Sequence, residues 1–242
     1  MNRYRRVMAI PAIGLLVVLL GVAQPMTTDA ASDVTAIDIL LDPDATMVKH
    51  AEAANARLRK DFPKGFVLDK THHPHISVLQ RYVKTADLPK VYAAVGKVLA
   101  TEKPATWKLK AYKYYYIPWK EIGLAGIVVE PTEDLIRYQK KLIDAVTPFT
   151  VETGTSAAFV TTKEDPEINE PTIEYVGAFV QNEIGPKFNP HVTIGIASQD
   201  YLKKMLEEKF EAFTFSPVGA SVYHLGNFGT ARKKLKSWEL TP

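Results

Sequence analysis

Two short stretches of the chain share one pattern: residues 71–79 read THHPHISVL, and residues 188–196 read FNPHVTIGI. Each contains, in this order, a proline, a histidine, a β-branched residue, a hydroxyl residue and another β-branched residue. The two histidines, His75 and His191, are separated by close to half the length of the chain. A pattern that occurs twice at this spacing predicts a duplicated lobe rather than a solenoid of short repeats.

Both stretches have the composition of β-strands, in which side chains alternate between two faces. His75 and Ser77 therefore share one face of the first strand, and His191 and Thr193 share one face of the second. The opposite faces are apolar and are expected to point into the core: Ile76, Val78, Val192 and Ile194. If the two lobes face each other, two imidazoles and two hydroxyls converge on one cleft.

These groups suit the cleavage of phosphodiesters without a metal ion. A neutral imidazole takes a proton from an attacking water or hydroxyl, and a protonated one gives a proton to the leaving oxygen. Free histidine titrates near pH ~6.5, so both forms are present near neutrality. A hydroxyl can donate to the non-bridging phosphate oxygens, where charge builds up. The pattern predicts His75 and His191 as catalytic residues, and Ser77 and Thr193 as phosphate-binding residues.

The motifs His75-Ile-Ser77-Val78 and His191-Val-Thr193-Ile194 resemble the paired His-x-Thr/Ser-x hallmark of the two-histidine (2H) phosphoesterase superfamily. This superfamily includes 2′-5′ RNA ligase-like and cyclic phosphodiesterase-like proteins. The resemblance implies an α+β fold of two pseudo-symmetric lobes, with antiparallel sheets lining a central cleft and helices outside. It also implies metal-independent action on 2′,3′-cyclic or 2′-5′ phosphodiester bonds. The first motif has Ser where many members have Thr, and both residues supply a hydroxyl.

The chain contains no cysteine, which excludes disulfides, cysteine-based zinc sites, iron–sulfur clusters and thiol nucleophiles. His73 and His75, at positions i and i+2, could chelate a metal ion. No cysteine or acidic residue nearby in the sequence completes a ligand set, however. We therefore expect neither a metal site nor a cofactor.

The first 31 residues predict an export signal. Three arginines in the first six residues precede an apolar stretch without charges, residues 7–23, and alanines follow it at positions 23, 30 and 31. This order of basic, apolar and small residues is typical of a secretory signal peptide. An uncleaved N-terminal membrane anchor is the alternative, and only then would the protein contact a membrane. The expected location is periplasmic or secreted.

The rest of the chain carries no excess charge. The sequence has 30 basic and 27 acidic residues, and three of the basic ones lie in the first six positions, so 27 of each sign remain. A binder of nucleic acid without sequence preference needs a basic surface, so such binding is not expected. Any recognition of phosphate must be local.

Residues 32–242 are predicted to form one bilobal domain of alternating strands and helices. The helices are expected at residues 44–63, 87–100, 131–146, 171–185 and 198–210, with Asp44 or Thr46 capping the first and Ser198 the last. Strands are expected at residues 34–41, 75–83, 107–117, 122–130 and 188–197, and in three segments after residue 212.

Other candidates have simpler interpretations. His72 and His73 are expected in a loop as solvated residues. Alternation places Arg81 on the face of His75, as a phosphate contact or a solvated cation. The aromatic residues of one strand could stack on a base, although packing is the favoured interpretation: Tyr112, Tyr114, Tyr115, Tyr116 and Trp119.

The function predicted from these observations is an exported phosphodiesterase that works by paired-histidine acid–base catalysis. Its substrate is expected to be a small nucleotide or an RNA end, and the protein is expected to be a monomer. The alternative is a non-catalytic protein that binds a nucleotide or phosphorylated ligand in the same cleft. A metal-dependent hydrolase is a further alternative, which treatment with a chelator tests.

Overall fold

The computed structural model describes residues 33–69, 71–163 and 165–241. The export signal or anchor predicted in residues 1–31 lies outside these residues. None of the helices in the described part of the chain is both long enough and apolar enough to cross a membrane.

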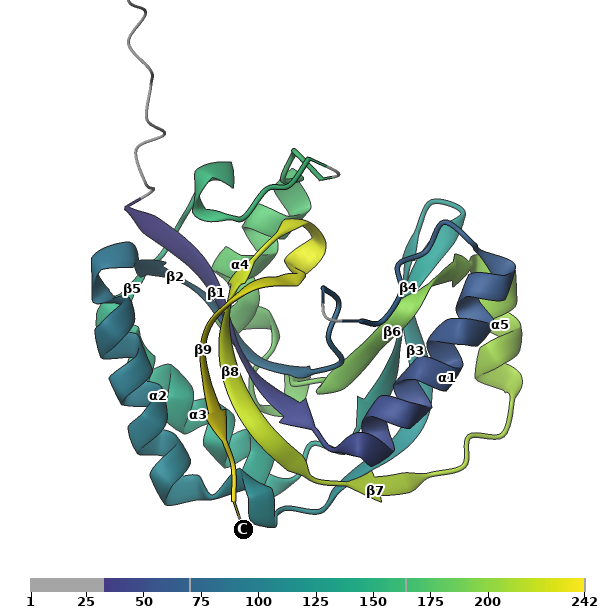
Figure 1. Cartoon of the computed structure of the whole chain (residues 1–242), viewed down its shortest axis with the longest axis horizontal. Helices are drawn as coiled ribbons and strands as arrows, with labels where there is room; N and C mark the ends of the chain where they lie inside the picture. The colour runs from purple at the N-terminus through teal and green to yellow at the C-terminus, as the bar shows by residue number, and fades with distance from the viewer. Residues whose placement is uncertain (1–32, 70, 164, 242) are drawn as a thin grey trace, which may run out of the picture. The chain divides into compact units, whose positions relative to one another are not determined.

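The described residues form one curled antiparallel sheet of nine strands (Figure 1). Eight of them follow one another in the order β7 (Phe213–Phe215), β3 (Leu109–Trp119), β4 (Ile122–Val129), β6 (His191–Ser198), β2 (Ile76–Lys84), β1 (Val34–Pro43), β8 (Pro217–Leu225) and β9 (Ala231–Glu239). The short strand β5 (Thr150–Val151) pairs with β2. The sheet has two halves, which are the two predicted lobes, and they meet where β6 pairs with β2.

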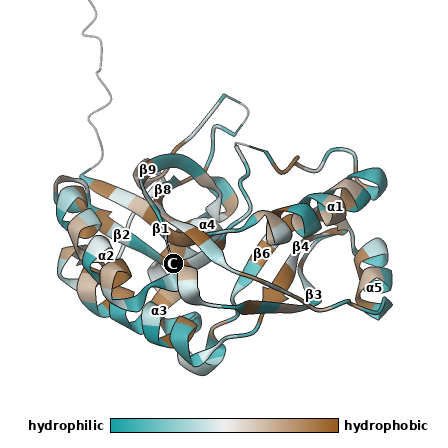
Figure 2. Cartoon of the chain, turned by 60° about the horizontal axis from the view of Figure 1, so that its bottom comes forward, coloured by the Kyte–Doolittle hydropathy of each residue, from teal (hydrophilic) through white to brown (hydrophobic). Residues whose placement is uncertain are grey.

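Four of the five helices in the described residues pack on the outside of the two halves (Figure 1). Contacts with β6, β3 and β4 come from α1 (Ala45–Asp61) and α5 (Gln199–Glu207). Behind the other half, α2 (Leu88–Glu102) packs against α3 (Glu133–Val146). The fifth helix, α4 (Glu170–Asn182), packs against β2. In Figure 2 the helices carry hydrophilic and hydrophobic residues in turn, as expected of amphipathic helices with one buried face.

Strand β1 shows how the sequence sets the two faces of the sheet. Its odd-numbered apolar residues, Ile37, Ile39 and Leu41, lie in the main hydrophobic core. On the opposite face Ala36 belongs to a smaller cluster with residues of α4, and Asp38 follows two residues later. The even-numbered face of β1 is therefore covered by α4 at one end and carries polar groups beyond it.

The α+β fold with antiparallel strands is as predicted, and four of the helices lie outside, whereas α4 covers part of the opposite face of β1. Asp44 caps α1 by accepting from the backbone N–H groups of Thr46 and Met47, and Ser198 caps α5. Several boundaries differ from the prediction by a few residues, and two of them are informative. Helix α4 ends at Asn182, before a short 3₁₀ turn that begins at Gly185 with φ of +57°. The segment predicted as one strand at residues 213–218 is divided at Ser216 into β7 and β8.

Candidate active site

The two motifs lie side by side because their strands are neighbours. Ile76 of β2 pairs with Val192 of β6, and this antiparallel pair joins the two halves of the sheet. Extending the register by one residue in each direction places His75 next to Thr193, and Ser77 next to His191. The apolar residues that alternate with these four are fully buried, as predicted. The structure thus brings all four predicted site residues together on one face.

Both strands also contain the same irregularity. In β2, Leu79 pairs with Ile39 and Ser77 with Leu40, which leaves Val78 as the extra residue of a bulge. In β6, Gly195 pairs with Ala125 and Thr193 with Gly126, which leaves Ile194 as the extra residue. The bulge falls at the fourth position of each motif. Bulges of this kind redirect side chains and occur often beside active sites.

The two imidazoles are held in the same way. Nδ1 of His75 lies 2.6 Å from the carbonyl oxygen of His73, and Nδ1 of His191 lies 2.7 Å from the carbonyl oxygen of Asn189. A carbonyl oxygen only accepts, so each Nδ1 must carry the hydrogen and donate it. In the neutral form the lone pair is then on Nε2. Each histidine is therefore oriented to exchange a proton through Nε2.

The surroundings of the two histidines differ in charge. Oδ2 of Asp38 lies 3.8 Å from Nε2 of His75. Asp38 is fully buried, and the same oxygen accepts hydrogen bonds from Ser77 Oγ at 2.5 Å and Gln80 Nε2 at 3.2 Å. Burial raises the pKa of Asp38, while the charge of a protonated His75 and the two hydrogen bonds act in the opposite direction. A proton on His75 thus has a carboxylate beside it.

His191 faces an aromatic ring instead. The rings of His191 and Tyr115 are in T-shaped contact, with centroids 4.7 Å apart. Burial lowers the pKa of His191 to about 4; the hydrogen bond to Asn189 opposes this shift and the charge of His75 adds to it. No acidic side chain forms an ion pair with His191 within the described part of the chain. His191 is therefore neutral near pH 7.

The two hydroxyls differ as well. Ser77 donates its hydrogen to Asp38, whereas the hydroxyl of Thr193 makes no hydrogen bond to any residue that the structure describes. The role of both residues in binding phosphate stays a prediction. Thr193 has its hydrogen available for a phosphate oxygen, and Ser77 would have to release Asp38 first or bind through its lone pairs.

Sequence reasoning missed Asp38 and Gln80. The signal for Asp38 was present, since this residue is an acid inside the otherwise apolar run VTAIDILL at residues 34–41. A charged residue is almost never fully buried without a partner. Gln80 was missed because the bulge at Val78 shifts the alternation of β2 by one residue. For the same reason the placement of Arg81 on the face of His75 was wrong. Arg81 pairs with the core residue Ile37, and its Nη2 lies 3.5 Å from Thr150 Oγ1.

The two preceding histidines are more than solvated loop residues. The ring of His72 stacks on Phe66, with centroids 4.7 Å apart. Nε2 of His73 lies 3.4 Å from Oδ1 of Asp42, which follows Asp38 on the same face of β1. The carbonyl of His73 also accepts the hydrogen bond from His75. The contact between His73 and Asp42 therefore links the loop before β2 to strand β1. Groups of three or more His, Asp or Glu residues suited to a metal ion are not found in the described ranges.

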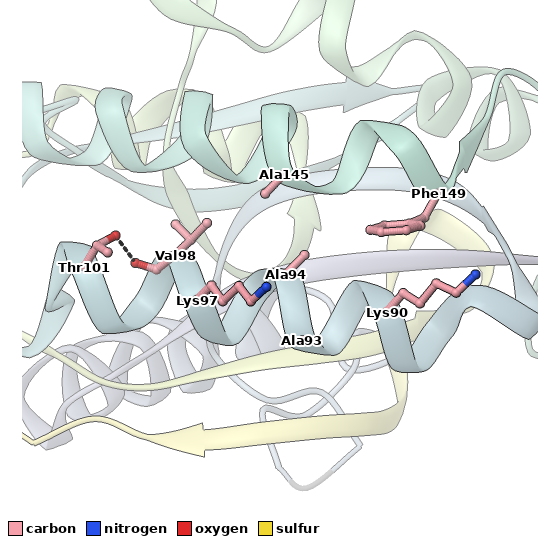
Figure 3. A pocket seen from close by; sticks show the side chains of 8 residues that line it. All are labelled: Lys90, Ala93, Ala94, Lys97, Val98, Thr101, Ala145 and Phe149. Carbon is pink, nitrogen blue, oxygen red and sulfur yellow. Dashed lines mark hydrogen bonds between the residues drawn. The ribbon is translucent and has the colours of Figure 1, made fainter.

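A separate groove lies on the outer surface between α2 and α3 (Figure 3). It measures about 500 Å³ and is lined by Lys90, Ala93, Ala94, Lys97, Val98, Thr101, Ala145 and Phe149. None of the motif residues lines it.

Several solved structures are similar to this chain. The TT0787 protein of Thermus thermophilus has 16% identity and a TM-score of 0.49, covering 85% of this chain and 98% of its own. E. coli LigT complexed with NADP+ has 13% identity and a TM-score of 0.41, covering 86% and 99%. Kluyveromyces marxianus Usb1 has 8% identity and a TM-score of 0.39, covering 88% and 99%. No family model and no curated protein matches the chain. At this level of similarity the case for a function rests on the site itself.

Proposed function

We propose that the protein is a metal-independent phosphodiesterase that hydrolyses 2′,3′-cyclic phosphates or 2′-5′ phosphodiester bonds of nucleotides or RNA ends. The observation that carries this proposal is the pair of imidazoles, each anchored through Nδ1, of which only one has a carboxylate at its Nε2. Acid–base cleavage of a phosphodiester needs one histidine that accepts a proton and one that donates it.

The difference in surroundings assigns the two roles. His191 is neutral near pH 7, so its Nε2 takes the proton of the attacking water as the new P–O bond forms. His75, whose Nε2 lies beside Asp38, gives a proton to the oxygen that leaves as the old P–O bond breaks. Thr193 donates to a non-bridging oxygen of the phosphate. The proton taken up by His191 is released to solvent and His75 is protonated again, which restores the starting state.

The test is a screen of purified protein against 2′,3′-cyclic mononucleotides, 2′-5′ dinucleotides and RNA that ends in a cyclic phosphate, with products identified by mass. We expect turnover of at least one class, unchanged by EDTA and lost in His191→Ala. Loss of wild-type activity on chelation, restored by zinc or magnesium, would contradict the metal-free mechanism. Saturable binding without product in any class would favour the non-catalytic binding protein.

We further propose that the protein acts outside the cytoplasm, which rests on the order of arginines, apolar residues and alanines in residues 1–31. N-terminal sequencing of the natural protein is expected to find a start after Ala23 or after Ala31. A chain that begins at Met1 and is recovered from a soluble cytosolic fraction would disprove export.

A further inference from the structure

Strand β3 carries further side chains on the face that contacts His191. Alternation along β3 turns Tyr114 and Tyr116 toward the main core, while Tyr115 contacts His191 on the other face. The next two residues on the face of Tyr115 are Ile117 and Trp119, and their exposed fractions are 52% and 42%. Two large, solvent-exposed apolar side chains thus lie along β3 on the face of Tyr115, the residue that contacts His191.

Phe228 completes this surface from the other half of the sheet. It lies in the turn between β8 and β9, and its ring contacts that of Trp119 with centroids 4.9 Å apart. Phe228 is 53% exposed. The hairpin of β3 and β4 and the hairpin of β8 and β9 therefore touch through two exposed rings. We call Ile117, Trp119 and Phe228 the exposed strip.

The turn that carries Phe228 is held in a costly conformation. Phe228 has φ of +56°, in the left-handed region that a bulky residue rarely adopts. Its N–H donates to Thr172 Oγ1 at 3.0 Å, and the side chain of the preceding Asn227 is bonded to Asn169 and Asp165. Backbone strain that neighbouring groups enforce in this way is found mainly at functional sites. Here the strain presents an exposed ring, which packing of the core does not explain.

The geometry points to the exposed strip as a binding site for the nucleobases of an oligonucleotide whose reacting phosphate lies at His75 and His191. This inference rests on the proposed function and narrows its substrate to a chain of at least two nucleotides. At ~3.3 Å per residue, Ile117 lies about 7 Å and Trp119 about 13 Å from Tyr115 along β3. The base next to the reacting phosphate then contacts Ile117, and the following base contacts the aromatic pair.

The character of the surface fits this occupant. Stacking on aromatic rings binds bases without much regard to sequence, because every base has a π-face. Lys120 follows Trp119 at the tip of its hairpin, is exposed, and has no ion-pair partner in the part of the chain that the structure describes, so its charge is available to the nucleic acid backbone. Leu206 and Val218 are also large exposed apolar residues, but they lie on α5 and β8 and not on β3 or the turn of Phe228.

The experiment compares kcat/KM for a 2′,3′-cyclic mononucleotide with that for a tetranucleotide that ends in a 2′,3′-cyclic phosphate. The variants are Trp119→Ala and Phe228→Asn, because Asn tolerates the left-handed conformation. Each should lower kcat/KM for the tetranucleotide roughly 10–100-fold, the range expected for loss of one stacked base. The value for the mononucleotide should stay within about twofold of wild type. Leu206→Ala, at a residue 47% exposed, is the matched control and should change neither value.

Equal losses on both substrates would overturn the inference, since the hairpins would then only support the catalytic groups. Wild-type kcat/KM for the tetranucleotide in both variants would overturn it as well. If the wild type turns over neither these substrates nor a 2′-5′ dinucleotide, the proposed function fails, and binding of a fluorescently labelled tetranucleotide decides the inference by itself. Anisotropy should then show weaker binding in Trp119→Ala than in Leu206→Ala, and equal affinities would overturn it.

Discussion

The two motif strands, β2 and β6, have nearly the same backbone and different surroundings. In both, the histidine donates from Nδ1 to the carbonyl two residues earlier, and the fourth motif position is a bulge. Nε2 of His75 lies near the buried carboxylate of Asp38, whereas His191 contacts the ring of Tyr115. The two motifs thus share the orientation of their imidazoles but not their electrostatic environment.

This difference matters because an acid and a base require opposite properties at the same pH. A nearby carboxylate favours a proton on its partner, and an apolar, buried surrounding disfavours one. A strictly symmetric pair would give both histidines the same protonation state at a given pH. The comparison therefore predicts that the two halves of the site respond differently to the same kind of substitution.

The largest effect is expected from removing either imidazole. His75→Ala and His191→Ala should each lower kcat/KM on the order of 10²–10⁴-fold, because each removes one proton transfer. The double variant should lose far less than the product of the two single losses, since both residues serve one catalytic cycle. Steady-state kinetics on a substrate found in the screen measure all three. Full activity in either single variant would refute the paired acid–base assignment.

A smaller effect is expected from Asp38→Asn, which keeps the shape and a hydrogen-bond acceptor for Ser77 but removes the charge beside His75. The loss of a charged partner should lower kcat/KM roughly 10–100-fold. The pH profile of kcat/KM should also shift in this variant, because a carboxylate that favours a proton on its neighbour is removed. Asp42→Asn is the matched control, since Asp42 lies on the same face of β1 but contacts His73 and Ser221.

An unchanged pH profile in Asp38→Asn, with reduced activity, would show that the residue only supports the strand. An equal shift of the pH profile in Asp42→Asn would show that the effect is not specific to the acid beside His75.

The sequence predicted the repeated elements of the fold well and their irregularities poorly. The paired motifs, the apolar face of each strand and the caps at Asp44 and Ser198 all depend on local spacing, which can be read from one sequence. Bulges depend on pairing with a partner strand. Hence the bulge at Val78, and with it the positions of Gln80 and Arg81, required the structure. Asp38 is 39 residues from Ser77 in sequence, and only the pairing of β1 with β2 brings them together.

The hydroxyls of the two motifs should also respond differently. Thr193→Val removes a hydroxyl without a partner among the described residues, and should cost about 1.5–3 kcal/mol of transition-state stabilisation with little change in the free energy of unfolding. Ser77→Ala should lower activity too, but it also deprives a buried carboxylate of a donor and should therefore destabilise the fold. Kinetics together with urea unfolding separate the two cases. Wild-type rates in both variants would remove the hydroxyls from the mechanism.

The smallest effect is expected in the dependence of stability on pH, where the difference between wild type and a His191 variant reports on His191. Its pKa is about 4 in the folded protein and near 6.5 in the unfolded chain, because burial disfavours the charged form. As the pH falls from 6.5 to 4, the unfolded chain takes up a proton that the folded protein does not. The contribution of His191 to stability is thus complete above pH 6.5 and is lost progressively below it.

Urea unfolding at pH 7.5 and pH 4.5 should show a smaller fall in the free energy of unfolding for His191→Gln than for wild type. Burial also lowers the pKa of His224, which bonds to the carbonyl of Ala158 outside the site, so His224→Gln measures the same effect for a structural histidine. If His191→Gln loses as much stability as wild type over this range, His191 is not buried in a neutral form, and its assignment as the base loses its physical support.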